Sequence, residues 1–251
     1  MGIANRESVK QVMEEHRPWA LINAAGFARV DEAELNKELC FRENALGPVI
    51  LAKLCQEYGA IFLTFSSHMV FDGQSNSPYL ESSPAAPLNI YGLSKLEAEA
   101  KVLEINPTAL VIRSSSFFGP WDERNFLFEM IGRLEEGQPF QASKDHVISP
   151  TYVPDLVNNC LDLIIDKARG IWHWTNPSQV TWAEFAFMAA ETIRLNTALI
   201  ETVDRNQLGY RAKRPAFSAL ASENGSLLPR LHDAINRFAL ERACTQTLIE
   251  R

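Results

Sequence analysis

Apolar residues in the first half of the chain alternate between helical spacing and short uninterrupted runs. In the first helical stretch Val9, Val12 and Met13 share one face, and an apolar run follows within a few residues. Short apolar runs bounded by turn residues are typical of buried strands. The pattern predicts helices at 7–16, 31–58 (bent near Gly47-Pro48) and 91–104, and buried strands at 19–26, 60–67 and 109–114.

Beyond Gly119-Pro120 the pattern becomes a mixture of helices and short extended segments. Thr181 and Glu184 have the spacing of a capping box, which predicts a helix from there to about Arg194. The other elements expected are helices at 125–136 and 154–167, an extended segment at 149–152, a strand at 170–175 and, before them, a surface loop at 73–87. Alternating strands and helices predict an α/β fold with a parallel sheet covered on both faces.

Composition narrows the class of partner. The chain has 251 residues, 46% of them apolar, and a formal net charge of -7, which disfavours nucleic acid and anionic membranes as partners. No apolar run approaches the roughly 18 residues that a membrane span requires. The four cysteines have no metal-binding or redox spacing, so we expect reduced, mostly buried thiols, no metal site and a cytoplasmic protein.

Tyr91 and Lys95 are the strongest candidates for chemistry. They lie four residues apart near the start of an expected helix, so their side chains share one face. A nearby ammonium lowers the pKa of a phenol and makes it a usable proton donor and acceptor. The same spacing also occurs by chance on many helices, so the pair alone leaves both interpretations open.

Two strand ends add context. Parallel α/β sheets bind ligands at the carboxyl ends of their strands, where Ser67 follows the strand at 60–67. The small residues of 23–26 allow a flat ring or a ribose to approach the backbone closely. Each segment is equally compatible with an ordinary turn.

Several motifs occur in an order and at intervals that resemble one known family. The chain resembles the dTDP-4-dehydrorhamnose reductases, extended short-chain dehydrogenases/reductases that act on nucleotide sugars, from about residue 3 to about residue 240. The motifs are Asn23-Ala24-Ala25-Gly26, 43–48, Ser66-Ser67-His68-Met69-Val70-Phe71-Asp72-Gly73, 87–95, Phe118-Gly119-Pro120, Ser149-Pro150-Thr151-Tyr152 and Arg214-Pro215.

This resemblance implies a site and a reaction, the reduction of a 4-keto nucleotide sugar in dTDP-L-rhamnose synthesis. Tyr91 is then the proton donor to the sugar C4 oxygen while NADPH, or NADH, delivers hydride. Lys95 lowers the pKa of Tyr91 and holds the nicotinamide ribose, and Ser67 orients the carbonyl. The implied cofactor-binding residues are Asn23, Ala24, Ala25, Gly26, Asn44, Ser66, Tyr91 and Lys95, and the implied substrate-binding residues are Ser67, His68, Met69, Ser149, Thr151 and Arg214.

The resemblance also implies a doubly wound, NAD(P)-binding Rossmann-like sheet with a small mixed α/β substrate lobe. A partial dinucleotide-binding domain is expected over 1–115 and mainly a substrate-binding lobe over 116–251, with 149–175 returning to the sheet. The Gly-x-Gly-x-x-Gly turn of such proteins does not occur upstream of residue 23, so we expect an N-terminally truncated sheet with an open edge strand. A homodimer, or a fusion or partner protein that supplies the N-terminal strands, is compatible with this expectation.

Three features depart from the family pattern or stand outside it. His68 and Met69 replace an acid and a phenol, which weakens the prediction of the particular sugar. A nucleotide-sugar epimerase or dehydratase, and a non-catalytic subunit like the regulatory subunit of methionine adenosyltransferase, therefore remain alternatives. Arg211, Lys213 and Arg214 form a basic cluster that suits either a diphosphate or a solvated loop, and His173 is expected to be buried.

Overall fold

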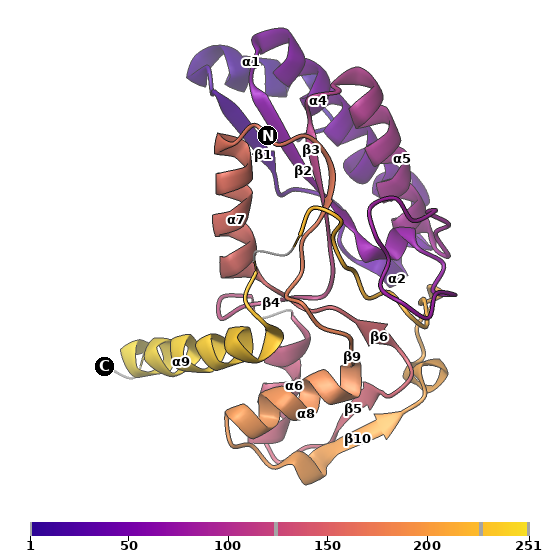
Figure 1. Cartoon of the computed structure of the whole chain (residues 1–251), viewed down its shortest axis with the longest axis vertical. Coiled ribbons are helices and arrows are strands. Elements are labelled where there is room, and N and C mark those ends of the chain that lie inside the picture. Colours follow the sequence, from indigo (N-terminus) through magenta and orange to yellow (C-terminus); the bar gives the residue numbers. More distant parts are fainter. Residues whose placement is uncertain (1, 123–124, 226–227, 250–251) are drawn as a thin grey trace.

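Four parallel strands form the central sheet of the computed structural model, which describes residues 2–122, 125–225 and 228–249 (Figure 1). Their order is β1-β2-β3-β8, and each pairs in parallel with its neighbour. The strands are β1 (Ala20–Asn23), β2 (Ile61–Ser67), β3 (Leu110–Ser114) and β8 (Gly170–His173). The predicted α/β class with a parallel sheet is therefore confirmed, as are the four predicted strands.

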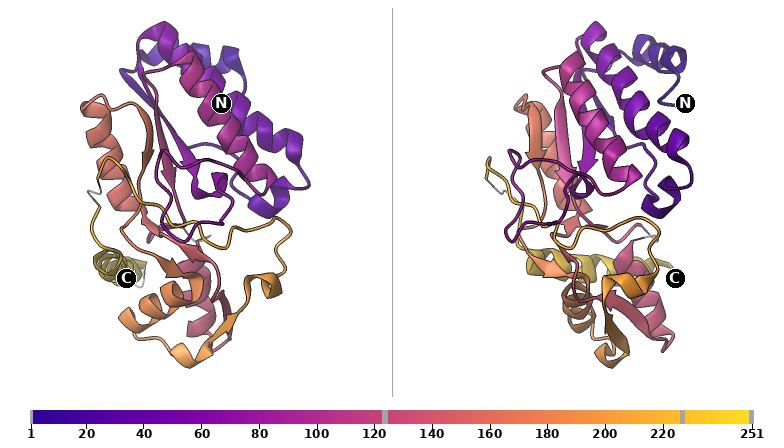
Figure 2. Two further views of the ribbon diagram at one scale, coloured as in Figure 1. Left: turned by 45° about the vertical axis from the view of Figure 1, so that its right-hand side comes forward. Right: turned by 90° about the vertical axis from the view of Figure 1, so that its right-hand side faces the viewer.

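Helices cover both faces of this sheet (Figure 2). On one face, Phe62 and Val111 pack with apolar residues of α1 (Arg6–His16), α4 (Gly47–Tyr58) and α5 (Ile90–Ile105). On the other face, Leu63 and Ile112 pack against α7 (Val153–Ile165). Successive strand residues point to opposite faces, so the continuous apolar runs of β2 and β3 supply both cores.

The predicted helix 31–58 is broken into several elements, and one junction between them falls at Gly47, where a bend was predicted. The segment forms α2 (Val30–Ala33), α3 (Lys37–Phe41), a π-helical turn (Arg42–Leu46) and α4. Pro48 lies in the first turn of α4, where a missing N–H is tolerated, and it cannot donate to the carbonyl of residue 44. The chain widens into the π turn at that point, which faces Asn44 inward.

The C-terminal lobe has its own apolar core. Phe118, Tyr152 and Phe185 meet at its centre. The capping box at Thr181 and Glu184 is confirmed. The remaining elements are β4 (Phe117–Phe118), α6 (Phe126–Glu135), β5 (Phe140–Ser143), β6 (Val147–Ile148), β7 (Thr151–Tyr152), β9 (Val180–Thr181), α8 (Trp182–Thr192), β10 (Ile200–Val203), α9 (Leu231–Ile249) and 3-10 turns at His68–Val70, Thr197–Leu199 and Arg205–Leu208.

Strands β5 and β10 and helix α9 were not predicted. β5 and β10 pair in parallel across about 60 residues of sequence, so neither carries a hairpin signal of its own. Between them the chain leaves the lobe, forms α7 and β8, and returns (Figure 1). The lobe thus lies at the carboxyl end of the sheet, beside the ends of β2 and β3.

Strand β1 forms one edge of the sheet. Among the described residues no strand pairs with its outer side, and Ile22 and Trp19 remain 42% and 65% exposed. Such an edge offers unpaired backbone groups to another strand. No helix within the described ranges is both long and apolar enough to cross a membrane.

Candidate active site

The carboxyl ends of β1 and β2 and the first turn of α5 surround a cavity of about 270 Å³, here called the Tyr91 cavity. Its walls are mainly apolar, with Asn23, Ser66, Tyr91 and Lys95 as polar residues. It is lined by Asn23, Ala24, Ala25, Gly26, Phe27, Ala28, Phe65, Ser66, Tyr91, Lys95, Phe117, Val153, Leu156 and Val157. The structure thus brings Tyr91, Lys95, Ser66 and 23–26 together, as predicted.

Two buried asparagines shape the loop that follows β1. The Asn23 amide donates to Thr64 Oγ1 (3.1 Å) and accepts from the Ala25 N–H (3.2 Å). Asn44 accepts from the N–H of Phe27 (2.8 Å) and donates to its carbonyl (3.0 Å). A Cβ on Gly26 would lie 2.8 Å from Asn44 Oδ1, so this close packing requires glycine. Asn44 therefore supports the cavity wall rather than lining it.

The first turn of α5 packs closely against the segment that follows β2. The Asn89 side chain caps it by accepting from the Gly92 N–H (2.8 Å). A Cβ on Gly92 would lie only 2.1 Å from the Met69 carbonyl oxygen, so no larger residue fits there. These contacts fix the position of Tyr91 next to the end of β2.

The Tyr91 phenol keeps its proton firmly. Burial raises its pKa to about 12, and the Ser67 hydroxyl, which hydrogen-bonds it, and the Arg214 charge lower the pKa only in part. The net direction is opposite to the implied lowering by Lys95. Lys95 Nζ lies 5.7 Å from the Tyr91 ring centroid and donates instead to the Phe65 carbonyl (3.1 Å), so its charge is directed at the backbone.

Lys95 carries an ammonium that is easily deprotonated. Burial lowers its pKa to about 8, while the Cys40 thiol wherever it is ionised, and the Glu99 carboxylate, favour the protonated form. Side chains with perturbed pKa values in a cavity are candidates for function. Near pH 7 the cavity therefore holds a neutral phenol and a cation.

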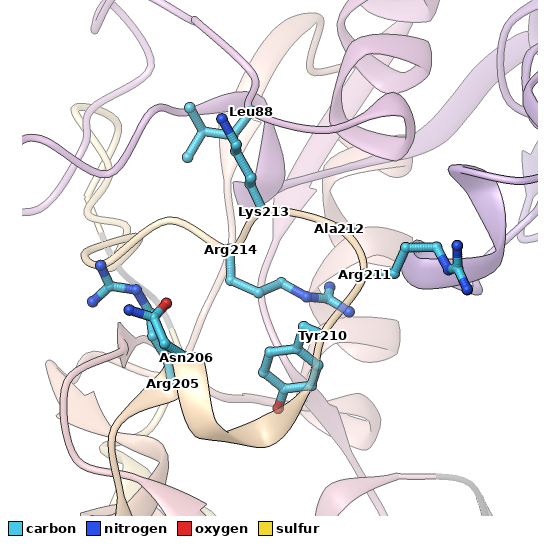
Figure 3. A pocket seen from close by; sticks show the side chains of 8 residues that line it. All are labelled: Leu88, Arg205, Asn206, Tyr210, Arg211, Ala212, Lys213 and Arg214. Carbon is cyan, nitrogen blue, oxygen red and sulfur yellow. The ribbon is translucent and has the colours of Figure 1, made fainter.

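A second cavity of about 410 Å³, here called the basic cavity, lies on the lobe side. Arg214 extends across it above the Tyr210 ring, with 4.7 Å from the guanidinium carbon to the ring centroid, while Arg211 turns outward (Figure 3). The lining residues are Leu88, Arg205, Asn206, Tyr210, Arg211, Ala212, Lys213 and Arg214. Four of these eight carry a positive charge and none is acidic, so the cavity favours an anion.

Arg214 connects the two cavities. Its Nη2 donates to Asp31 Oδ2 (2.6 Å), while its buried Nε has no hydrogen-bond partner in the described part of the chain. Its charge also acts on the Tyr91 phenol. A buried donor without a partner is costly, and a ligand oxygen in this position would satisfy it.

His68 and Met69 are buried behind these groups and line neither cavity. Burial lowers the pKa of His68 to about 4, so its ring is neutral near pH 7. Its Nδ1 lies 3.3 Å from the Ser114 carbonyl oxygen, and its Nε2 lacks a partner among the described residues. The positive charge of Arg214 also lowers the pKa of His68. Contact between His68 and a substrate stays a prediction.

Ser149 and Thr151, two of the implied substrate-binding residues, are not brought to either cavity. The Ser149 hydroxyl donates to the Ser178 carbonyl (2.6 Å) and accepts from the Leu220 N–H (3.1 Å). Thr151 Oγ1 accepts from the Ser115 N–H (3.4 Å). Both side chains are completely buried, so their hydroxyl groups stabilise the lobe instead.

Sequence reasoning missed the apolar walls of the Tyr91 cavity and part of the basic cavity. Phe27, Phe65 and Phe117 look like ordinary core residues in the sequence. They form the cavity wall only because three segments that are distant in the sequence meet there. Arg205 and Tyr210 carry no motif, although the basic cluster at 211–214 pointed to the same loop. Within the described residues no group of three or more His, Cys, Asp or Glu side chains could hold a metal ion, and His173 is buried as expected.

Comparison with known proteins agrees with this geometry. A dTDP-4-dehydrorhamnose reductase of Streptomyces griseus is 31% identical over 229 residues, which cover 88% of this chain and 74% of that protein. A solved Bacillus anthracis dTDP-4-dehydrorhamnose reductase in complex with NADP is 31% identical, with a TM-score of 0.92 over 96% of this chain and 87% of its own. Methionine adenosyltransferase 2 subunit beta of Xenopus laevis is 30% identical over 221 residues, 83% of this chain and 65% of that protein.

The family assignment covers nearly the whole chain. Residues 1–247 match the family described as the RmlD substrate binding domain. This match confirms the resemblance drawn from the motifs, and the Bacillus anthracis structure confirms the Rossmann-like fold class. The chain therefore belongs to the RmlD substrate binding domain family.

Proposed function

We propose that this protein is an oxidoreductase that uses NADPH to reduce the C4 keto group of a dTDP-linked sugar. The observation that carries the proposal is the position of the Tyr91 phenol, which lines an apolar cavity and interacts with Arg214 of the basic cavity. A proton donor at this junction suits a ketone held between a cofactor and an anionic group. The names of the reductase relatives support the same reaction.

The Tyr91 cavity fits a nicotinamide and its ribose. Ala24, Ala25 and Gly26 present backbone and small side chains, and Phe65 and Leu156 provide flat apolar walls. Lys95 and Tyr91 offer a cation and a hydroxyl for the ribose. When bound, NADPH supplies the hydride that the sugar C4 accepts.

The side chains of this protein supply the proton and hold the ketone. Ser67 donates a hydrogen bond that keeps the carbonyl oxygen beside the Tyr91 phenol. The high pKa of Tyr91 keeps its proton in place until negative charge develops on that oxygen, which then takes the proton from the phenol. The ketone, a hydride and a proton together give the alcohol, so the reaction balances.

The basic cavity receives the diphosphate of the sugar nucleotide in this proposal. Arg214 is the main contact, because its guanidinium is partly unsatisfied and lies near Tyr91. Lys213 and Arg205 add positive charge to the wall. The sugar then extends from the basic cavity toward the Tyr91 phenol.

The proposed function also divides the chain between two sites and suits a reducing compartment. Residues 1–115 would contribute mainly to the cofactor site and 116–251 mainly to the sugar site, with β8 in the sheet and α7 packed against its face. Cys40, Cys55 and Cys160 are buried free thiols and Cys244 is an exposed one, which suits a reducing compartment such as the cytoplasm. The open outer side of β1 is where a second copy or a partner strand would pair.

A regulatory subunit on the same fold is the second candidate. The 30% identity to methionine adenosyltransferase 2 subunit beta favours it. A non-catalytic protein would not use the Tyr91 proton. The variant Tyr91→Phe therefore distinguishes the two candidates, since it should impair only a reductase. An epimerase or dehydratase would give no net consumption of NADPH.

The test is NADPH oxidation with a dTDP-4-keto-6-deoxyhexose, followed by fluorescence, in the wild type and in Tyr91→Phe. We expect Tyr91→Phe to lower kcat by about 10²- to 10⁴-fold, because the proton donor is lost. Tyr58→Phe is the matched control, since that phenol is exposed, donates to Glu14 and lies just before the start of β2, at the opposite end of this strand from Tyr91. Wild-type protein without turnover, or a Tyr91→Phe variant with full activity, would refute the reductase.

A further inference from the structure

A chain of buried polar contacts runs from the wall of the Tyr91 cavity into the core. The Ser66 hydroxyl donates to Glu99 Oε1, and Arg113 donates to both carboxylate oxygens, Nε to Oε1 at 2.8 Å and Nη2 to Oε2 at 2.6 Å. Glu99 and Arg113 are each 3% exposed. Burying such a pair is costly and is weak evidence of a contribution to stability, so its position calls for another explanation.

The pair lies directly behind two polar groups of the cavity. Glu99 is one turn after Lys95 on α5, so the two side chains share a helix face. They also contact neighbouring residues of β2. Lys95 Nζ donates to the Phe65 carbonyl (3.1 Å), and Glu99 accepts from Ser66.

Arg113 is fixed from several directions. Its Nη1 lies 3.3 Å from His173 Nε2 and donates to the Glu81 carbonyl (3.4 Å). Its guanidinium carbon lies 5.2 Å from the centroid of the Phe71 ring. An arginine held in this way leaves the Glu99 carboxylate little freedom to turn away from Ser66.

We propose that Glu99 is a positioning residue of the reductase site. Its carboxylate, held by Arg113, fixes the Ser66 hydroxyl in the cavity wall and supplies the negative charge that keeps Lys95 in its ammonium form. The proposal rests on the proposed function in so far as Ser66 and Lys95 face the cofactor there.

Among the titratable groups around Lys95, Glu99 supplies the negative charge near pH 7. The titratable groups that face Lys95 in the described chain are Cys40 of α3, and Tyr91 and Glu99 of α5. Burial raises the pKa of the Cys40 thiol and of the Tyr91 phenol, so both are neutral near pH 7. The walls from β2 and α7 present a backbone carbonyl, a hydroxyl and apolar side chains.

The first experiment follows the titration of Lys95 itself. In protein labelled at the lysine ¹³Cε, the Lys95 NMR signal is assigned by its loss in Lys95→Arg. We expect Glu99→Gln, which keeps an acceptor for Ser66 but removes the charge, to lower the Lys95 midpoint by about one pH unit. Glu99→Asp keeps the charge and should leave the midpoint within about 0.3 units.

Matched variants separate this role from general destabilisation. Asp155→Asn removes the carboxylate of another ion pair, between the buried Asp155 and the half-exposed Arg237, and should not move the Lys95 midpoint. If Glu99→Gln does not fold, the double variant Glu99→Gln/Arg113→Met removes both charges and should lower the Lys95 midpoint by less than one pH unit, since loss of the Arg113 cation acts in the opposite direction. An unchanged midpoint in the folded charge-removing variant, or an equal shift in Asp155→Asn, would overturn the proposal.

The second experiment measures turnover. Ser66→Ala and Glu99→Asp should each lower kcat/KM with NADPH about tenfold while the Lys95 midpoint stays in place, because only the hydroxyl is lost or displaced. Full activity in both variants would refute the positioning of Ser66. A wild type without turnover would refute the proposed function alone, since the NMR titration still decides the role of Glu99.

Discussion

The Tyr91 cavity and the basic cavity are neighbours but are built in different ways. The first is formed by strand ends and a helix start whose polar groups are fixed by buried hydrogen bonds, such as those of Asn23 and Asn44. The second is formed largely by the segment 205–214, where Arg211 and Lys213 are exposed. The chemistry is thus assigned to rigid elements and the anion recognition to a surface loop.

This difference predicts different kinetic consequences. In the proposed function the groups of the Tyr91 cavity act on the reacting atoms, so a change there should affect the chemical step. The groups of the basic cavity contact, in the same proposal, a part of the substrate that does not react, so a change there should affect binding. Variants of each cavity therefore test whether the two functions are separate.

After Tyr91→Phe, the largest effect is expected from Lys95→Met. Loss of the ammonium from an apolar cavity should lower kcat/KM by about 10²- to 10³-fold, measured by steady-state kinetics with NADPH. Lys101→Met on the same helix is the control, since Lys101 forms an exposed pair with Glu97. A loss of less than tenfold would show that the cation is not needed for the reaction.

Arg214→Ala should act mainly on binding. Removal of the guanidinium should raise the KM of the sugar nucleotide about 10- to 100-fold, with a smaller change in kcat. Arg6→Ala, which breaks an exposed pair with Glu57, serves as the control for loss of an arginine. A variant that loses kcat but retains KM would show that Arg214 acts in the chemical step, so the two cavities would not have separate functions.

Gly26→Ala tests the wall of the Tyr91 cavity. The new methyl group would collide with Asn44 Oδ1 and push the loop outward, so the KM of NADPH should rise about tenfold. Gly132→Ala on α6 has open space around its Cβ and should leave the kinetics unchanged. An unaltered KM in Gly26→Ala would mean that the loop does not approach the cofactor.

The smallest effect concerns pH. The ammonium of Lys95 is the active form and its pKa is about 8, so activity should fall as pH rises and reach about half near pH 8. The free energy of unfolding should change in the opposite direction to activity as the pH rises. The unfolded chain binds the Lys95 proton more tightly, so unfolding free energy from this group rises between about pH 8 and 10.5. A flat activity profile between pH 7 and 9 would contradict the assignment.

The sheet could be predicted from the sequence because its signals are local. The apolar runs of β2 and β3 and the Asn89 cap of α5 are readable within a few residues. Pro48 is a local signal for an irregular helix near residue 47, but the packing of the π turn, in which Asn44 meets the backbone of Phe27, could not be predicted from the sequence. The pairing of β5 with β10 is equally non-local.

The candidate site could be predicted only in part, for the same reason. Tyr91, Lys95 and Ser67 follow from spacing and motif order. The direction of the Tyr91 pKa did not, because it is set by burial, which a motif does not report. Ser149 and Thr151 were assigned by position in a motif, but their hydroxyl groups are satisfied by backbone groups of other segments.

The contact between Gly92 and Met69 has a consequence for how this enzyme can diversify. The first turn of α5 rests on the main-chain carbonyl of residue 69, a group that every amino acid provides. Side chains at 68 and 69 can therefore be exchanged over generations while the tyrosine keeps its place. On the prediction that residues 68 and 69 face the sugar, preference for one sugar over another can change at these positions without rebuilding the catalytic step, provided that residue 92 stays glycine.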